Sequence, residues 1–374
     1  MINRSIQARI IDRLKDNKAI IILGPRQVGK TTLLDQLFSS NPKTLWLNGD
    51  EQSTRVLLEN VNTTKWKQIL GKAETLIIDE AQRIQEIGLK IKLITDQINN
   101  VKVILSGSSA FELKNQINEP LTGRKWEYEL YPFSFQELSN YTNLVQELSN
   151  LENRLVFGCY PEVVNHSGNA REYLESLAES YLFKDIFTWQ QIKKPEKLLK
   201  LLQAIAFQVG NEVSYNELGN MVGLDNQTVE NYITTLERAF VIFRLQPLSM
   251  NLRKELKTKR KIYFYDNGIR NAIIAQFSAI ETRTDIGALW ENYFISERLK
   301  MNAYNGIKVN TYFWRTSDQQ EIDYIEFRDG VYQTFELKWN PNKSCKLSKT
   351  FASAYPNNSY NVINRQNYFE FLLT

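Results

Sequence analysis

The 374-residue sequence has little of what several classes of protein require. It contains one histidine, His166, and two cysteines, Cys159 and Cys345. Two cysteines cannot form a disulfide framework, and so few Cys and His side chains exclude a zinc site, so any metal must be a hard ion held by oxygen atoms. Lys and Arg number 46 against 42 Asp and Glu, a formal net charge of +4 that indicates no polyanionic partner by itself.

Long apolar segments are also missing. No apolar run approaches the roughly 20 residues that cross a bilayer. The first residues, MINRSIQARIIDRL, have the pattern of an amphipathic helix and lack the apolar core of a signal peptide. We therefore expect a soluble, cytoplasmic protein with no membrane partner. The composition, 43% hydrophobic and 24% charged, is that of a folded protein, and the length suggests two or three domains.

The first part of the chain alternates short apolar runs with helical patterns. The runs are Ala19–Leu23 (AIIIL), Thr44–Asn48 (TLWLN), Thr75–Asp79 (TLIID) and Val101–Gly107 (VKVILSG). Continuous apolar strands separated by helices predict an α/β fold, with a parallel sheet covered on both faces.

The rest of the chain changes pattern several times. Leucine and phenylalanine recur at helical spacing from about Phe135 to Gln203. Ser214–Leu245 then predicts a helix, a tight turn, a helix and a strand, and a second strand at Lys261–Tyr265 follows as in a winged helix. A long helix and several strands are expected after Ser278. The predicted domains are residues 1–134, 135–203, 204–277 and 278–374.

A phosphate-binding loop is the most specific motif. Gly24–Thr31 (GPRQVGKT) fits G-x-x-x-x-G-K-[ST], with a strand before it and a helix after it. In such a loop, backbone N–H groups and the helix N-terminus surround phosphate oxygens. Lys30 should reach the β- and γ-phosphates of ATP, and Thr31 should ligate Mg²⁺. The expected nucleotide-binding residues are Gly24, Gln27, Val28, Gly29, Lys30, Thr31 and Thr32.

Two acidic residues end a later strand and complete this prediction. Asp79 fits the carboxylate that holds Mg²⁺ or its water, and Glu80 fits the residue that polarises the attacking water. The alternative for the glycine loop alone is a tight turn between strand and helix, and the paired acidic residues argue against it.

Two further residues are weaker candidates for the nucleotide site. Ser108, within the serine-rich end of the next strand, is placed to sense the γ-phosphate, the alternative being an ordinary turn. Arg124 is a candidate arginine finger, acting within the chain or across the interface of a homo-oligomer. Its alternative is a surface arginine in a salt bridge.

The ordered segments GPRQVGKTT, LIIDEAQR, LSGSSA, LTGR, LYPFSFQEL and FGCYPEVV resemble a family of prokaryotic AAA-type ATPases. The resemblance covers nearly the whole chain and implies ATP binding, a winged helix and a C-terminal restriction-endonuclease-like domain. In that family Gly29, Lys30, Thr31, Asp79 and Glu80 correspond to nucleotide-site positions. Cys159 stands where the family usually has glycine, and no arginine of an AAA lid is evident.

A predicted hairpin gathers charged residues near the C-terminus. Asp329-Gly330 between two alternating runs predicts a two-residue turn that pairs Arg328 with Val331. Asp323 then lies opposite Glu336. Opposed carboxylates repel unless something positive joins them, so a Mg²⁺ between Asp323 and Glu336 is expected.

The D…E-x-K spacing of this hairpin, with Lys338 beside the metal, resembles the PD-(D/E)-x-K nuclease core. That resemblance implies a further catalytic glutamate on the preceding helix, for which we select Glu291. One alternative is a solvated hairpin with a Glu321–Lys338 ion pair. Another is a nuclease fold that binds without cleaving.

The expected winged helix offers two surfaces for DNA. Its second helix, from about Asn226, carries Glu230 and Glu237 against Arg238 and is a poor surface for a polyanion. The basic segment Asn251–Lys261 is a better candidate for contacts to DNA phosphates. The alternative for this segment is a solvated charged hairpin. We therefore expect ATP hydrolysis coupled to a DNA-directed function, with Mg²⁺-dependent cleavage or a nucleotide-controlled switch or scaffold that only binds.

Overall fold

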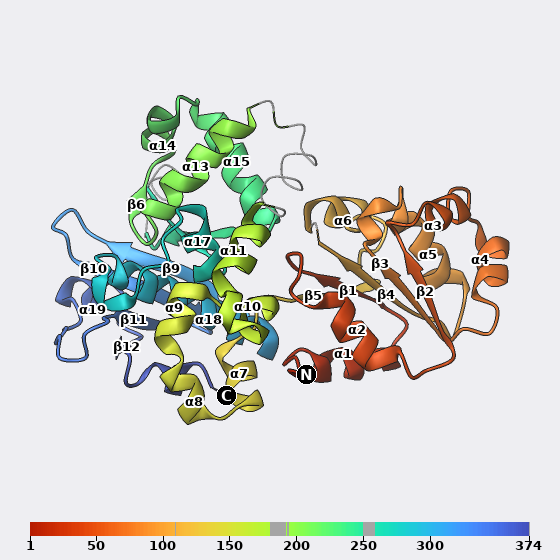
Figure 1. Ribbon diagram of the computed structural model, residues 1–374, viewed down its shortest axis with the longest axis horizontal. Coiled ribbons are helices and arrows are strands. Elements are labelled where there is room, and N and C mark those ends of the chain that lie inside the picture. The colour runs from red at the N-terminus through yellow and green to blue at the C-terminus, as the bar shows by residue number, and fades with distance from the viewer. Residues whose placement is uncertain (109, 180–191, 193, 250–258, 374) are drawn as a thin grey trace. The chain divides into compact units, whose positions relative to one another are not determined.

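The computed structural model describes residues 1–108, 110–179, 192, 194–249 and 259–373 (Figure 1). The chain divides into two compact units. The first unit comprises Met1–Tyr131 with Arg238–Phe240, and the second comprises Pro132–Glu237 with Val241–Thr374. No helix within the described residues is long and apolar enough to cross a membrane.

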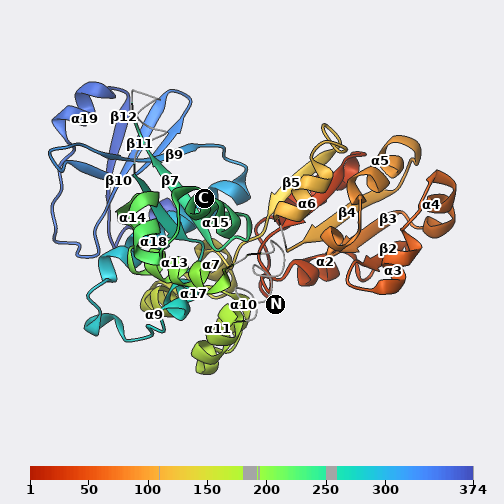
Figure 2. The same ribbon diagram turned by 90° about the horizontal axis from the view of Figure 1, so that it is seen from above.

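The first unit is built on a five-stranded parallel sheet in the order β2-β3-β4-β1-β5. Its strands are β1 (Ala19–Leu23), β2 (Thr44–Asn48), β3 (Thr75–Asp79), β4 (Lys102–Gly107) and β5 (Lys125–Glu129). Its helices are α1 (Gln7–Asp12), α2 (Lys30–Phe38), α3 (Gln52–Leu57), α4 (Thr63–Leu70), α5 (Ile87–Gln97) and α6 (Ala110–Ile117). These helices lie on both faces of the sheet (Figures 1 and 2).

The predicted α/β fold is confirmed for this unit. Strands β1, β2 and β3 have the predicted bounds, and β4 begins one residue later than expected. Strand β5 was not predicted, because it lies at the edge of the sheet and its sequence, KWEYE, carries charges that a buried strand would not tolerate. Since all five strands are parallel, their carboxyl ends meet at one edge, where the loops after β1, β3 and β4 converge.

The second unit contains a mixed seven-stranded sheet in the order β12-β11-β10-β9-β7-β8-β6. Its strands are β6 (Glu212–Val213), β7 (Ile242–Pro247), β8 (Arg260–Phe264), β9 (Asn310–Arg315), β10 (Glu321–Arg328), β11 (Val331–Leu337) and β12 (Asn358–Ile363). Its helices are α7 (Phe135–Tyr141), α8 (Leu144–Ser149), α9 (Leu151–Phe157), α10 (Pro161–Asn165), α11 (Ala170–Ala178), α13 (Pro195–Phe207), α14 (Tyr215–Val222), α15 (Asn226–Arg238), α17 (Asn267–Ile273), α18 (Ile286–Asn305) and α19 (Lys349–Ala354).

The predicted helix, turn, helix and strand occur as α14, a turn at Gly223, α15 and β7. Gly223 is left-handed (φ 68°), and the Asp225 carboxylate accepts the N–H of Thr228 at 2.9 Å, which caps α15. Strand β7 pairs with β8 on one side and runs parallel to β9 on the other. One sheet therefore crosses the boundary expected at residues 277 and 278, and the four domain ranges stay predictions.

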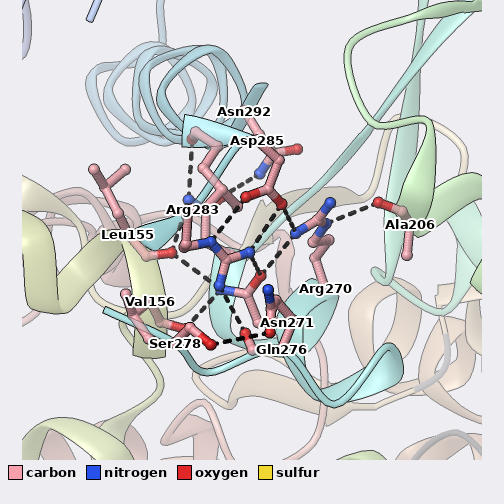
Figure 3. A network of polar contacts seen from close by, with 12 residues as sticks. Leu155, Val156, Ala206, Arg270, Asn271, Gln276, Ser278, Arg283, Asp285 and Asn292 are labelled. Atoms are coloured by element: carbon pink, nitrogen blue, oxygen red, sulfur yellow. Dashed lines mark hydrogen bonds and ion pairs between the residues drawn. The ribbon is translucent and has the colours of Figure 1, made fainter. Parts of the chain in front are cut away.

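A buried polar network ties the helices of the second unit together (Figure 3). Arg270 donates to Asp285 at 2.6 Å, and Arg283 donates to the same carboxylate at 2.8 and 2.9 Å. The amide oxygen of Asn271 accepts from both arginines, and its amide nitrogen donates to two carbonyls of α9. Burial alone would raise the pKa of Asp285, but the two guanidinium groups outweigh burial. The pKa of Asp285 therefore lies below its ordinary value. Since Asp285 directly precedes α18, this network fixes the start of that helix.

Candidate functional sites

The glycine-rich loop has the backbone shape that its motif predicts. Gly29 is left-handed (φ 88°) and is followed at once by α2. Gly24 is needed for a different reason, because a Cβ atom there would lie 2.1 Å from the carbonyl oxygen of Leu130. Gln27 is also left-handed (φ 59°), and Val28 is buried. The loop therefore turns sharply between β1 and α2 while contacting the end of β5.

Lys30 lies inside this loop with 6% of its surface exposed. Its ammonium group donates to the carbonyl oxygens of Gly24 at 2.9 Å and Pro25 at 2.8 Å. Burial lowers the pKa of Lys30 to about 8, and the negative charges of Glu80 and Asp79 offset only part of that effect. The positive charge of Lys30 is therefore incompletely compensated by the protein, as expected of a group that meets an anion.

Polar side chains from β3 and β4 converge beside the loop. The Thr31 hydroxyl donates to the Asp79 carboxylate at 2.6 Å, and the hydroxyl of Ser106 donates to the other oxygen of Asp79. Glu80, in the left-handed conformation (φ 47°), accepts from the hydroxyl of Ser108 at 2.9 Å. The carboxylates of both acidic residues are thus held by neighbouring hydroxyl groups.

These residues fit the expected Mg²⁺. Thr31 and Asp79 place a hydroxyl and a carboxylate side by side at the carboxyl edge of the sheet, and Mg²⁺ prefers such hard oxygen ligands. Since Mg²⁺ is usually bound by only one or two protein oxygens together with water and phosphate, two are enough here.

Sequence reasoning missed two contributors to this site. The Arg4 guanidinium donates to the Val28 carbonyl at 2.6 Å and to the Tyr131 carbonyl at 2.6 Å, so it braces the loop from the N-terminal segment. The amide of Gln82 donates to Glu80 and to Ser108. Gln82 was within reach as a polar residue just after the acidic pair, whereas nothing in the sequence near Arg4 indicates its role.

The structure corrects the prediction for Arg124. Its guanidinium pairs with Asp96 at 2.5 Å, and its carbonyl accepts the N–H of Ala19 at the start of β1. Arg124 therefore lies at the amino edge of the parallel sheet, opposite the edge that carries the glycine-rich loop. A finger acting within this chain is excluded by that placement. The Ser109 end of the serine-rich turn lies outside the described residues.

The C-terminal hairpin forms in the predicted register. Arg328 pairs with Val331 and Tyr324 with Phe335, and Asp329 and Gly330 are both left-handed (φ 51° and 80°), as a two-residue hairpin turn requires. One feature was not predicted: the pairing of β10 with β9 shifts register between Ile322 and Ile325. This bulge re-aims Asp323, whose carboxylate accepts the N–H of Leu337 at 2.7 Å.

Three of the four predicted residues of the C-terminal cluster contact one another, and the fourth, Glu291, contacts a different lysine. Lys338 contacts Asp323 at 3.3 Å and Glu336 at 2.7 Å. Glu291 of α18 contacts Lys261 at 3.0 Å. Glu297, on the other face of α18, pairs instead with Lys300 at 2.6 Å, as expected from its position on the helix.

Lys261 was expected in a DNA-binding segment, and its position is a correction. It is 2% exposed on β8, contacts Glu321 at 2.7 Å as well as Glu291, and cannot reach a phosphate backbone. Lys259 is exposed, whereas residues 250–258 lie outside the described residues. The alternative Glu321–Lys338 ion pair is also not formed between these two described residues, because each has the partners just given.

Charges within the cluster change the protonation of its members. Burial raises the pKa of Glu291 to about 7, and Asp323 adds to this while Lys261 opposes it. Burial alone would lower the pKa of Lys261, but the negative charges of Glu291, Asp323 and Glu321 outweigh burial. The pKa of Lys261 therefore lies above its ordinary value. The pKa of Lys338 is raised in the same way, by Asp323 and Glu336.

The side chains of this cluster do not fit the expected Mg²⁺. One oxygen each of Glu291, Glu321, Asp323 and Glu336 already accepts from a lysine ammonium group or a backbone N–H, so a Mg²⁺ would have to displace these donors. Asp323 and Glu336 are therefore joined by Lys338, where a metal was expected.

The fold and the loop geometry define the first unit as a P-loop domain. Residues 16–139 match a family described as AAA domain. Residues 148–280 and 286–371 match two families described as domains of unknown function, DUF8612 and DUF4143. These findings support an ATPase-type function for the first unit.

Several relatives align with most of this chain at low identity. The chain is 24% identical over 359 residues to an uncharacterized protein of Mycobacterium tuberculosis, covering 94% of this chain and 76% of that protein. It is 26% identical over 380 residues to an uncharacterized protein of Haemophilus influenzae, covering 93% and 90%. The solved structure of a Walker-type ATPase of Pyrococcus abyssi aligns with a TM-score of 0.51 at 16% identity, covering 73% of this chain and 96% of that one. This last likeness supports the fold.

Proposed function

We propose that the first unit binds ATP with Mg²⁺ and hydrolyses it. The observation that carries this proposal is the contact of Thr31 with Asp79 at 2.6 Å, directly beside a buried lysine inside a glycine-rich loop. The carboxyl edge of the sheet thus carries a cation (Lys30), a pair of oxygen ligands for a hard metal (Thr31 and Asp79) and a second carboxylate (Glu80). This is the set of groups that phosphoryl transfer to water requires.

Each residue has a distinct role in the proposed reaction. Lys30 neutralises the β- and γ-phosphates, while Thr31 and Asp79 hold the metal. Bound Mg²⁺ would withdraw charge from the phosphate oxygens. Glu80 orients and polarises the attacking water, and Ser108 positions Glu80 by its hydrogen bond. Ser108 thus acts through Glu80, not as a direct γ-phosphate sensor.

The test is ATP turnover by Glu80→Gln in the full chain. Turnover should fall by about 10²- to 10⁴-fold, the usual contribution of a positioned acid or base, while ATP affinity is kept. The exposed Glu119→Gln in the same unit is the matched control and should hydrolyse ATP normally. Wild-type turnover by Glu80→Gln would remove Glu80 from this role.

We also propose that the second unit binds DNA under the control of the nucleotide, without metal-dependent cleavage. The support for a DNA-directed role is the grouping of Glu291, Asp323, Glu336 and Lys338 around one hairpin and helix, which resembles a nuclease core. The support for binding without cleavage is that Lys261 and Lys338 already neutralise these carboxylates.

This second proposal is tested by DNA anisotropy and DNA degradation in parallel. We expect binding whose affinity differs between ATP-bound Glu80→Gln and nucleotide-free protein, and no degradation with Mg²⁺ or Mn²⁺. Lys259→Ala should reduce the salt dependence of binding by about one unit of slope. No DNA binding in either state would overturn the DNA role, and metal-dependent degradation would restore the nuclease.

A further inference from the structure

Two carboxylates, those of Glu291 and Glu321, contact the buried ammonium group of Lys261. The Nζ atom of Lys261 lies 3.0 Å from Oε1 of Glu291 and 2.7 Å from Oε1 of Glu321, and the lysine side chain is 3% exposed. The Tyr263 hydroxyl donates to the same Glu291 oxygen at 2.6 Å. The centroid of the Phe313 ring lies 5.6 Å from the ammonium. Carboxylates, a hydroxyl and an aromatic ring thus enclose one positive charge.

The backbone holds Lys261 in this place. On β8 it pairs with Leu245 of β7 and with Glu212 of β6, so it sits in an interior strand of the sheet. Glu291 comes from α18, and Glu321 begins β10. The ammonium group therefore joins the strands that follow the helix-turn-helix to the helix and hairpin of the C-terminal region.

We infer that Lys261 is the resident cation of this cluster and takes the place of a divalent metal. Glu291 and Glu321 are spaced for hydrogen bonds to an ammonium group, at 2.7 to 3.0 Å. Mg²⁺ requires oxygen atoms at about 2.0–2.1 Å in near-octahedral order. A divalent ion entering the same space would meet a buried positive charge that Glu291 and Glu321 hold in place.

Lys338 likewise neutralises two carboxylates of the cluster, those of Asp323 and Glu336. Its contacts with Asp323 and Glu336 relieve the repulsion between two opposed carboxylates, the task that a metal was expected to perform. It differs from Lys261 in being partly accessible, with 21% of its side chain exposed. Water screens the charge of Lys261 less than that of Lys338, so we expect the removal of Lys261 to have the larger effect on cation binding. This inference deepens the proposed metal-free role of the second unit and is independent of ATP hydrolysis.

Mn²⁺ binding to the full chain, without nucleotide, tests the inference. Free Mn²⁺ is followed by electron paramagnetic resonance, and unfolding by thermal melting. Wild type and Asp323→Asn should bind the same number of Mn²⁺ ions per chain. Lys261→Met keeps an unbranched side chain, one atom shorter and without the charge. This variant should bind about one more Mn²⁺ per chain than wild type and should melt at a higher temperature with Mn²⁺ than without it. Adding Asp323→Asn to Lys261→Met should abolish both gains, and Lys261→Arg should gain neither.

Two results would overturn the inference. The first is a Mn²⁺ ion that wild type binds and Asp323→Asn does not. This comparison tests the inference even if Lys261→Met does not fold. The other is a folded Lys261→Met that gains no Mn²⁺. An equivalent removed by Asp79→Asn belongs to the nucleotide site and is subtracted. Mn²⁺ binding by wild type without DNA degradation would overturn this inference alone, whereas loss of all DNA binding would overturn only the DNA role.

Discussion

The glycine-rich loop and the C-terminal cluster both place a nearly buried lysine near carboxylates, but they treat its charge in opposite ways. Lys30 donates to neutral carbonyl groups, and burial lowers its pKa to about 8. Lys261 donates to Glu291 and Glu321, and its pKa is raised. Lys30 has no anionic hydrogen-bond partner among these contacts, whereas Lys261 is paired with two carboxylates of the protein. Lys30, whose charge the protein leaves uncompensated, is therefore the better candidate of the two for contact with an anionic ligand.

Replacing each lysine by a neutral residue should separate these roles. The largest effect we expect is that of Lys261→Met on the stability of the second unit. Lys261→Met should lower the free energy of unfolding of the second unit by about 3–5 kcal/mol, because it leaves buried carboxylates without their partner. It should not change ATP affinity. Urea unfolding and a fluorescent-ATP titration measure the two quantities.

Lys30→Ala should show the reverse pattern. Its ATP affinity should fall by about 10- to 100-fold or more, since hydrogen bonds to charged groups contribute roughly 1.5–3 kcal/mol each. The first unit should keep or gain stability, because a poorly compensated buried charge is removed. Loss of stability in Lys30→Ala with unchanged ATP affinity would abolish the distinction between the two lysines.

The pH dependence of ATP binding sharpens the same comparison. The pKa of free Lys30 is about 8, and phosphate should raise it, so binding takes up a proton above pH 8. Affinity should be full below pH 8 and fall by up to about tenfold per pH unit above it, as one proton is linked to binding. Titration with a fluorescent nucleotide from pH 7 to pH 10 measures this. A flat profile would mean that Lys30 is compensated within the protein.

The smallest effect concerns Glu291, whose pKa of about 7 lies above the ordinary value of 4.5. The folded protein then holds a proton that the unfolded chain releases, so stability should fall as pH rises from about 4.5 to 7. Glu291→Gln should flatten that slope in urea unfolding curves, whereas the exposed Glu281→Gln should not. An unchanged slope in Glu291→Gln would show that Lys261 keeps Glu291 ionised throughout.

Local sequence patterns predicted some of these features and could not predict others. The bounds of β1, β2 and β3 follow from continuous apolar runs, and the register of the β10–β11 hairpin follows from Asp329-Gly330. The bulge beside Asp323 depends on pairing with a different strand, so the hairpin sequence carries no sign of it. Lys261 resembled its basic neighbours in the sequence. Its place inside β8 separates it from Lys259, which is exposed just before the strand, and the alternation of the strand separates it from Arg260.

The parallel pairing of β7 with β9 has a consequence for synthesis of the chain. The nascent polypeptide carries β7 from the ribosome well before β9 exists, and domains generally fold as they emerge. Until then one edge of β7 has unpaired N–H and C=O groups, which invite contact with other chains. Pro247, at the end of β7 opposite Phe313, lacks an N–H group and shortens that exposed edge. A fragment ending between β8 and β9 should therefore aggregate, although it contains the complete helix-turn-helix.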